Sequence, residues 1–259
     1  MSENYNNYLD FANILADASG DILRYYFKKS FEIEQKSDLS PVTQADIEVE
    51  QRIRLLIEEK FPSHGIIGEE LENKNPDAEF QWVIDPIDGT KSFIAGYPIF
   101  TTLIAITHNG KPVLGVINQP ILYERWSAIS GQKTLYNNSP LPSLESNVTL
   151  AQATLATTST GYFSDAQARK FAALKNSVAN TVLGGDGYAY AMLAHGNIDI
   201  VVDVALKPYD FCALPPIIEG IGGIITDWVG KPLTLKSDGN IIVSINKGLQ
   251  ELGLEKLTK

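Results

Sequence analysis

The 259-residue sequence contains little of several residue types on which whole classes of protein depend. Its one cysteine, Cys212, excludes an intramolecular disulfide framework and a cysteine-rich zinc fold. The three histidines lie far apart without the spacing of metal ligands, which argues against a histidine-based metal site. No uncharged stretch is apolar enough to cross a membrane, and the first residues do not resemble a secretory signal. We therefore predict a cytoplasmic protein without membrane contact.

Basic residues are also scarce, with 21 Lys and Arg against 31 Asp and Glu and a net charge of -10. Nucleic-acid binding depends on basic side chains that neutralise phosphates, so no nucleic-acid partner is predicted. The excess acid lies in residues 1–90, which hold 19 acidic and 8 basic side chains, whereas residues 91–259 hold 12 and 13. Either a solvated acidic surface or a group of carboxylates around a cation explains this asymmetry.

Apolar periodicity divides the chain into two parts. In the first part, helical spacing covers residues 8–27 and 44–60, and we predict a turn with an N-cap at residues 40–43. Short strands are predicted at 31–36, 64–68 and 80–84, followed by a meander at 101–107, 112–117 and 125–129 with an Asn109-Gly110 hairpin turn.

The second part follows a polar loop at residues 136–146. Strands are predicted there at 154–157, 181–183, 198–202 and 223–226, with helices at 164–175, 188–194 and 211–221. The pattern predicts an α/β (α+β) fold with an N-terminal α+β subdomain, residues 1–145, and a C-terminal α/β subdomain, residues 146–259. We expect the two to form one compact catalytic unit.

Three acidic clusters stand at the ends of predicted strands or at the start of a predicted helix. Glu69 and Glu70 follow the strand at 64–68, Asp85 and Asp88 follow the strand at 80–84, and Asp210 opens the helix at 211–221. Alone, each has an ordinary explanation as a solvated pair, a surface turn or a helix N-cap. Their occurrence together predicts a site of hard oxygen ligands, which favours Mg²⁺ or Mn²⁺ over zinc.

The middle cluster also suits a phosphate group. Pro86 is expected to end the strand, so that Asp88 points back toward Asp85. Gly89 permits a tight turn, and a helix that starts at Thr90 offers backbone N–H groups to an anion. Two cations about 3.5–4 Å apart beside such a turn would stabilise the attacking and leaving oxygens of a phosphoryl transfer.

The segments Gly68-Glu69-Glu70, WVIDPIDGTKSF (82–93) and YDFCALPPIIEGIGG (209–223) resemble the signatures of the inositol monophosphatase superfamily of Mg²⁺-dependent, lithium-sensitive phosphatases. The resemblance covers nearly the whole chain, with one departure at Tyr209, where many members have Trp. It implies a layered αβαβα sandwich of the inositol monophosphatase and fructose-1,6-bisphosphatase type, with the site between the subdomains. It also implies a homodimer.

The resemblance implies a role for each matching residue. It implies two or three Mg²⁺ ions per site, with Mn²⁺ as a substitute and Li⁺ as an inhibitor. The implied metal ligands are Glu69, Asp85, the Ile87 carbonyl oxygen, Asp88 and Asp210. The implied catalytic residues, which orient the attacking water, are Asp46, Glu70 and Thr90. The implied substrate contacts are Asp88, Gly89, Thr90, Asp186 and Asp203, and Lys36 occupies a position where the family often has a lysine near the site.

Within the superfamily, the segments 40–46, 91–98, 115–126, 184–190 and 206–214 resemble histidinol-phosphatases. The predicted function is Mg²⁺-dependent hydrolysis of L-histidinol phosphate, whose amine and imidazole require acceptors such as Asp186 and Asp203. An acid at position 203 also suits a polyol, so inositol-1-monophosphatase or another small sugar or nucleotide phosphatase is an alternative. A different class is a protein that uses the phosphatase fold as a scaffold to bind the transcription machinery. The intact set of candidate metal ligands argues against that purely structural role.

Overall fold

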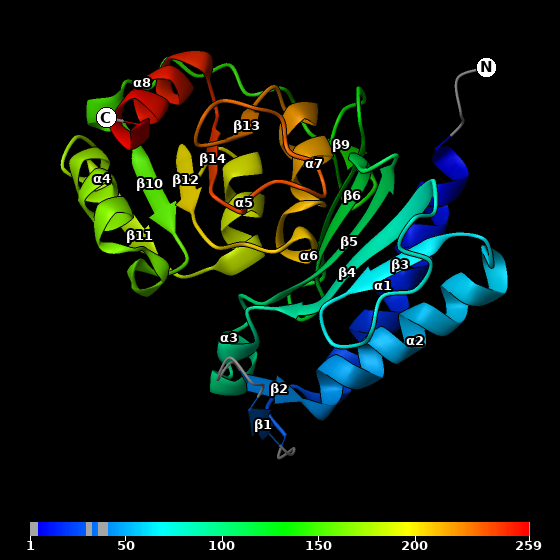
Figure 1. The fold of residues 1–259 in the computed structure, drawn as a ribbon. Coiled ribbons are helices and arrows are strands. Elements are labelled where there is room, and N and C mark those ends of the chain that lie inside the picture. The colour runs from blue at the N-terminus through cyan, green and yellow to red at the C-terminus, as the bar shows by residue number, and fades with distance from the viewer. Residues whose placement is uncertain (1–4, 30–32, 36–40, 259) are drawn as a thin grey trace.

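The computed structural model describes residues 5–29, 33–35 and 41–258, and their helices and strands form five alternating layers (Figure 1). The first layer consists of α1 (Asn6–Tyr26) and α2 (Gln44–Lys60), which pack against one face of a seven-stranded sheet. The middle layer is formed by α5 (Asp186–Ala194), α6 (Pro208–Phe211) and α7 (Leu214–Gly220). A five-stranded sheet follows, and α4 (Asp165–Lys175) and α8 (Lys247–Thr258) form the outer layer.

The seven-stranded sheet has its strands in chain order, and only the β3–β4 pair is parallel. Its strands are β3 (Gly65–Gly68), β4 (Phe80–Asp88), β5 (Thr101–His108), β6 (Lys111–Gln119), β7 (Glu124–Ile129), β8 (Leu135–Tyr136) and β9 (Ser139–Pro140). The short helix α3 (Thr90–Ala95) connects β4 to β5, and β1 (Ile33–Gln35) pairs with β2 (Pro41–Thr43) in a separate small sheet.

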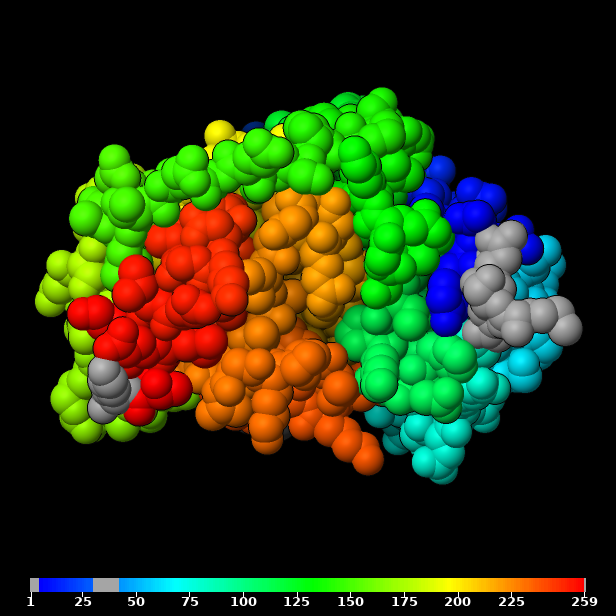
Figure 2. Space-filling view, turned by 90° about the horizontal axis from the view of Figure 1, so that it is seen from above, coloured from blue at the N-terminus to red at the C-terminus, as the bar shows by residue number. Residues whose placement is uncertain are grey.

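The five-stranded sheet has the order β11-β10-β12-β14-β13, with parallel pairs around β10 and antiparallel pairs around β14. Its strands are β10 (Thr154–Thr157), β11 (Asn180–Leu183), β12 (Ile200–Asp203), β13 (Ile224–Asp227) and β14 (Ile241–Ser244). Two 3₁₀ turns, Leu150–Gln152 and Thr160–Tyr162, flank β10. In Figure 2, the green middle of the chain runs along the upper rim from the blue and cyan N-terminal elements to the red C-terminal helix.

The two-residue alternation of strand side chains divides the core between the two faces of the seven-stranded sheet. In β4, Trp82 and Ile84 pack with α1 and α2, whereas Val83 belongs to the cluster around α5 and α7. That second cluster contains residues of both sheets, among them Leu103 and Val201. The helices of the middle layer therefore bury apolar surface against both sheets at once.

The helices expected in the first half and the Asn109-Gly110 turn are confirmed, the turn with φ values of 51° and 75°. The expected turn at 40–43 is wrong for Pro41–Thr43, which form a strand, although Thr43 does cap α2. The expectation that Pro86 ends its strand is also wrong. β4 continues to Asp88 through a bulge between Asp85 and Asp88, so Pro86 stands where no ladder hydrogen bond is needed. No strand was predicted where β8, β9 and β14 form, and no helix where α8 forms. The single helix predicted over 211–221 is wrong, because α6 ends at Phe211 and α7 begins at Leu214.

Within the described residues, no helix has both the length and the apolar character required to span a membrane.

A buried histidine lies in the aromatic cluster under α1. The His64 ring stacks between Phe61 and Phe80, with ring centroids 4.8 and 5.3 Å away. Its Nδ1 accepts a hydrogen bond from Trp82 Nε1 at 3.2 Å, so the neutral ring is the form that fits. Burial lowers the pKa of His64 from its ordinary value of 6.5.

We expect the free energy of unfolding to fall as the pH drops through 6.5, because the unfolded chain then binds a proton at His64 and the folded protein does not. Above that pH, His64 contributes fully to the free energy of unfolding. Below it, the contribution falls by no more than about 1.4 kcal/mol per pH unit until the pH reaches the lower pKa of the folded state. His64→Phe should reduce the slope of urea-unfolding free energy against pH between about pH 5 and 7. Identical slopes for the two proteins would contradict this assignment.

Candidate active site

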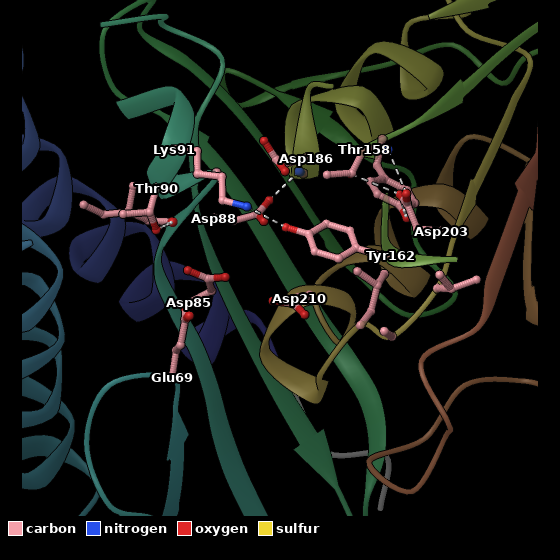
Figure 3. Close-up of a pocket in the computed structure, with 17 residues that line it drawn as sticks. Glu69, Asp85, Asp88, Thr90, Lys91, Thr158, Tyr162, Asp186, Asp203 and Asp210 are labelled. Atoms are coloured by element: carbon pink, nitrogen blue, oxygen red, sulfur yellow. Dashed lines mark hydrogen bonds between the residues drawn. The ribbon is translucent and has the colours of Figure 1, made fainter. Parts of the chain in front are cut away.

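A cavity of about 210 Å³ lies where the ends of β3, β4 and β12 face the starts of α3, α5 and α6 (Figure 3). Its lining residues come from both sheets and from the middle helix layer. Four separate segments of the chain bring carboxylates to it, namely those of Glu69, of Asp85 and Asp88 on β4, of Asp186 and of Asp210. The cavity is small, and the charge gathered in it distinguishes it from an ordinary packing defect.

Three of these carboxylates form a tight group. One oxygen from each of Asp85, Asp88 and Asp210 lies within 4.8 Å of the others. Asp85 is 1% exposed, and its Oδ1 has no hydrogen-bond partner in the part of the chain that the structure describes. Burial, with repulsion from Glu69, Asp88 and Asp210, raises the pKa of Asp85 well above its usual range.

The carboxylates of Asp88 and Asp210 also lie beside other carboxylates that repel them, but hydrogen bonds hold both in place. Asp88 Oδ2 accepts hydrogen bonds from Thr101 Oγ1 at 3.3 Å and from the backbone N–H of Gly187. Asp210 Oδ2 accepts the backbone N–H of Lys207 at 2.6 Å in the capping box of α6. Burial raises the pKa of Asp88 well above its usual range and that of Asp210 to about 7.

This arrangement fits a divalent cation. The unpartnered buried oxygen of Asp85 and the mutual repulsion of the group are both unfavourable in the protein alone, and a cation would relieve both. The side-chain atoms available as metal ligands are all carboxylate oxygens, the ligand type that Mg²⁺ and Mn²⁺ prefer.

A second polar group stands beside the cluster at the start of α3. Thr90 Oγ1 lies 3.0 Å from the Ile87 carbonyl oxygen and 3.5 Å from Asp46 Oδ1. Asp46 Oδ2 accepts the backbone N–H and the hydroxyl of Thr43 at 2.7 and 2.6 Å, so the carboxylate is fixed in the first turn of α2. Gly89 precedes Thr90 with a φ of 89°, a conformation that favours glycine.

The opposite wall carries two further carboxylates. Asp203 accepts hydrogen bonds from the Tyr190 hydroxyl at 2.8 Å, the Thr157 hydroxyl at 3.0 Å and the Thr158 N–H at 2.8 Å. No described residue donates a hydrogen bond to the carboxylate of Asp186, which lies close to Gly89. Burial, with repulsion from Asp203, raises the pKa of Asp186 to about 6 against the opposing effect of the nearby Lys91 ammonium group.

The structure brings most of the predicted site residues to this cavity. Those that line it are Glu69, Asp85, Ile87, Asp88, Gly89, Thr90, Asp186, Asp203 and Asp210. Asp46 stands behind Thr90, and Glu70 does not line the cavity. Lys36 lies outside the described residues.

Sequence reasoning missed a polar bridge across the cavity. Lys91 Nζ donates a hydrogen bond to the Tyr162 hydroxyl at 3.0 Å, which joins α3 to the 3₁₀ turn after β10 (Figure 3). Tyr190 and Thr158 in the opposite wall were also missed. Lys91 directly follows the Asp-Gly-Thr motif, which was a usable signal, whereas nothing local to Tyr162 indicated that it faces Lys91.

Comparison with known proteins agrees with the fold. The model of the inositol monophosphatase family matches residues 4–259. The bifunctional phosphatase IMPL2, chloroplastic, of Arabidopsis thaliana is 45% identical over 254 residues, which cover 95% of this chain and 73% of that protein. A histidinol-phosphatase of Chlorobaculum parvum is 35% identical over 93% of each chain. The structure of an inositol monophosphatase from Zymomonas mobilis has a TM-score of 0.91 and 42% identity, covering 99% of this chain and 100% of that one.

The layered fold and the acidic cavity thus define a metal-dependent phosphatase. The chain belongs to the inositol monophosphatase family.

Proposed function

We propose that this phosphatase hydrolyses L-histidinol phosphate to L-histidinol and phosphate with the help of Mg²⁺. The observation that carries the choice of substrate is Asp186, a carboxylate that faces the cavity outside the candidate metal cluster and has no donor among the described residues. A substrate with a cationic amine would supply that donor, and a charged hydrogen bond there would be stronger than one to a neutral hydroxyl. The resemblance to histidinol-phosphatases supports the same choice.

In this proposal Glu69, Asp85, the Ile87 carbonyl oxygen, Asp88 and Asp210 hold the cations. Bound there, Mg²⁺ supplies Lewis-acid activation of water and neutralises negative charge on the phosphoryl group. The chain's own contribution is to place the carboxylates around one point, with Asp85 and Asp203 almost fully buried in the cavity wall.

The attacking water is oriented by the pair of Thr90 and Asp46. The Thr90 hydroxyl would accept a hydrogen bond from the water and donate its single proton to Asp46 Oδ1, 3.5 Å away, once its nearer acceptor, the Ile87 carbonyl oxygen at 3.0 Å, holds a cation. Asp46 can hold this position because Thr43 anchors its other oxygen. Glu70 is proposed to complete the water network, and the backbone N–H groups of Gly89 and Thr90 to bind the phosphate.

A substrate panel tests the proposal. The protein is assayed with L-histidinol phosphate, myo-inositol 1-phosphate, fructose 1,6-bisphosphate and adenosine 3′,5′-bisphosphate, each with Mg²⁺ and with EDTA. We expect the highest kcat/KM for histidinol phosphate and a complete dependence on the cation. A higher kcat/KM for inositol phosphate would overturn the choice of substrate and favour the polyol alternative.

Assaying Asp186→Asn with the same substrates tests whether this carboxylate recognises the substrate amine. It should lower kcat/KM for histidinol phosphate about tenfold or more, because a charged pair in a buried site is weakened by about 1.4 kcal/mol or more. The value for inositol phosphate should change less, since that substrate brings no cation. The exposed Asp165→Asn serves as the matched control. Equal losses on both substrates would assign Asp186 a structural role instead.

The scaffold alternative makes a different prediction, namely phosphatase activity that is absent from the wild-type protein and partner binding that survives Asp88→Asn. The homodimer, the cytoplasmic location and the two-subdomain division remain predictions of the sequence.

A further inference from the structure

Helix α2 carries buried charged side chains along one face. Asp46, Glu50 and Arg54 follow one another at intervals of four residues, so all three project from the same side of the helix. Glu50 is 0% and Arg54 8% exposed, and Arg54 Nε lies 2.7 Å from Glu50 Oε1. Asp46 faces Thr90, but the other two side chains belong to no part of the mechanism above.

Glu50 and Arg54 use their remaining polar atoms on one loop. Glu50 Oε2 accepts the backbone N–H of Glu70 at 2.8 Å, and Oε1 accepts that of Leu71 at 3.2 Å. Arg54 donates from Nη1 to the carbonyl oxygen of Glu72 at 2.9 Å and from Nη2 to that of Leu71 at 3.1 Å. The pair therefore fixes the backbone of the three residues that follow Glu69.

Gly68 shows how closely the carboxylate approaches this segment. A Cβ at position 68 would overlap the carboxylate of Glu50, so the glycine makes room for it. The segment that carries Glu69 is thus held from its N-terminal side by the parallel pairing of β3 with β4 and on its C-terminal side by Glu50 and Arg54.

We propose that Glu50, held by Arg54, is a positioning residue that keeps the Glu69 carboxylate facing Asp85 before any cation binds. Four hydrogen bonds from the pair to the loop backbone replace the ordering that a cation would otherwise have to impose. The inference rests on the proposed role of Glu69 as a metal ligand.

The test compares Mn²⁺ binding by wild type, Glu50→Gln and Glu48→Gln, measured from the electron paramagnetic resonance signal of free Mn²⁺. Glutamine fills the same space, but its NH₂ group cannot accept a hydrogen bond, so one of the two backbone N–H groups that Glu50 binds loses its acceptor. We expect the dissociation constant for Mn²⁺ to rise about tenfold or more in Glu50→Gln, the effect typical of residues that orient metal ligands. Glu48→Gln makes the same chemical change at an exposed position of α2 and should bind as wild type does.

A lower Tm with unchanged Mn²⁺ affinity in Glu50→Gln would overturn the inference, because it would show a structural role alone. A wild-type protein that binds no Mn²⁺ would instead refute the metal site itself, and with it the proposed function. If Glu50→Gln does not fold, Arg54→Lys decides, since lysine keeps the charge but cannot reach both carbonyl oxygens. We expect Arg54→Lys to weaken Mn²⁺ binding as well.

Hydrogen exchange of the wild-type protein gives a readout that needs no variant. In EDTA, the backbone amides of Glu70 and Leu71 should exchange slowly, because Glu50 accepts both of them in the metal-free protein. Rapid exchange that slows only when Mn²⁺ is added would show that the cation orders the loop, which contradicts the inference.

Discussion

Replacing Asp85 with asparagine is expected to abolish nearly all phosphatase activity and at the same time to stabilise the metal-free protein. The amide would not be a charged ligand for the proposed cations, so we expect kcat to fall about a thousandfold or more, or about 4 kcal/mol of transition-state stabilisation. In EDTA, however, the change removes a cost to the folded protein, in which Asp85 is either ionised beside Glu69, Asp88 and Asp210 or holds a proton that the unfolded chain does not bind at neutral pH.

Measuring stability distinguishes the loss of a metal ligand in Asp85→Asn from a general folding defect. An amide at position 85 would donate to the neighbouring carboxylates, so we expect the Tm in EDTA at pH 8 to rise by about 2–4 °C for each kcal/mol of repulsion relieved. Calorimetry in EDTA and a phosphatase assay in Mg²⁺ measure the two effects. Asp77→Asn, the same change at an exposed turn position outside the helices, should alter neither. A fully active Asp85→Asn would refute the role of Asp85, and an inactive variant with a lower Tm would refute the electrostatic argument.

The second large effect is expected at Gly115, where β6 meets the chain segment between α6 and α7. A Cβ at this position would overlap the carbonyl oxygen of Ala213, a backbone atom that cannot rotate away. Gly115→Ala must therefore push the α6–α7 segment off the sheet. Overpacking of this kind costs about 3 kcal/mol, so the Tm should fall by about 6–12 °C.

Activity should fall with stability in this variant, because Asp210 lies in α6, three residues before the carbonyl that has to move. We expect a kcat several-fold lower at temperatures where the variant is folded. Urea unfolding and steady-state kinetics measure the two effects. Gly248→Ala, at an exposed position of α8 where the nearest atom to the new Cβ is 3.4 Å away, should leave kcat unchanged and should not lower the Tm, because alanine favours a helix more than glycine does. A Gly115→Ala protein as stable as wild type would show that the contact is loose.

Local sequence patterns predicted much of the fold because the physical causes are themselves local. The apolar stripe of α1 and the capping box of Thr43 and Asp46 are set within a few residues, as is the Asn109-Gly110 turn. Pro86 was misread for the opposite reason. A bulge depends on the neighbouring strand, and the sequence of β4 alone does not show that Asp85 pairs with Leu103 and Asp88 with Thr101.

For the site, the residue types and their order determined the chemistry. A set of carboxylates at element ends, with a glycine turn between them, selects a hard divalent cation and a phosphate whatever their exact positions. This is why Glu69, Asp85, Asp88 and Asp210 were identified from the sequence and found around one cavity.

Only the tertiary structure decided which groups face one another and which are left without partners. The N–H of Gly187 reaches Asp88 across 99 residues of sequence, and Glu50 reaches the Glu70 backbone across 20. The packing of both sheets on the middle helices also leaves Asp85 Oδ1 without a hydrogen-bond partner and the Asp186 carboxylate without a donor among the described residues. Such contacts depend on the positions of whole layers, which no pattern within one helix or strand encodes.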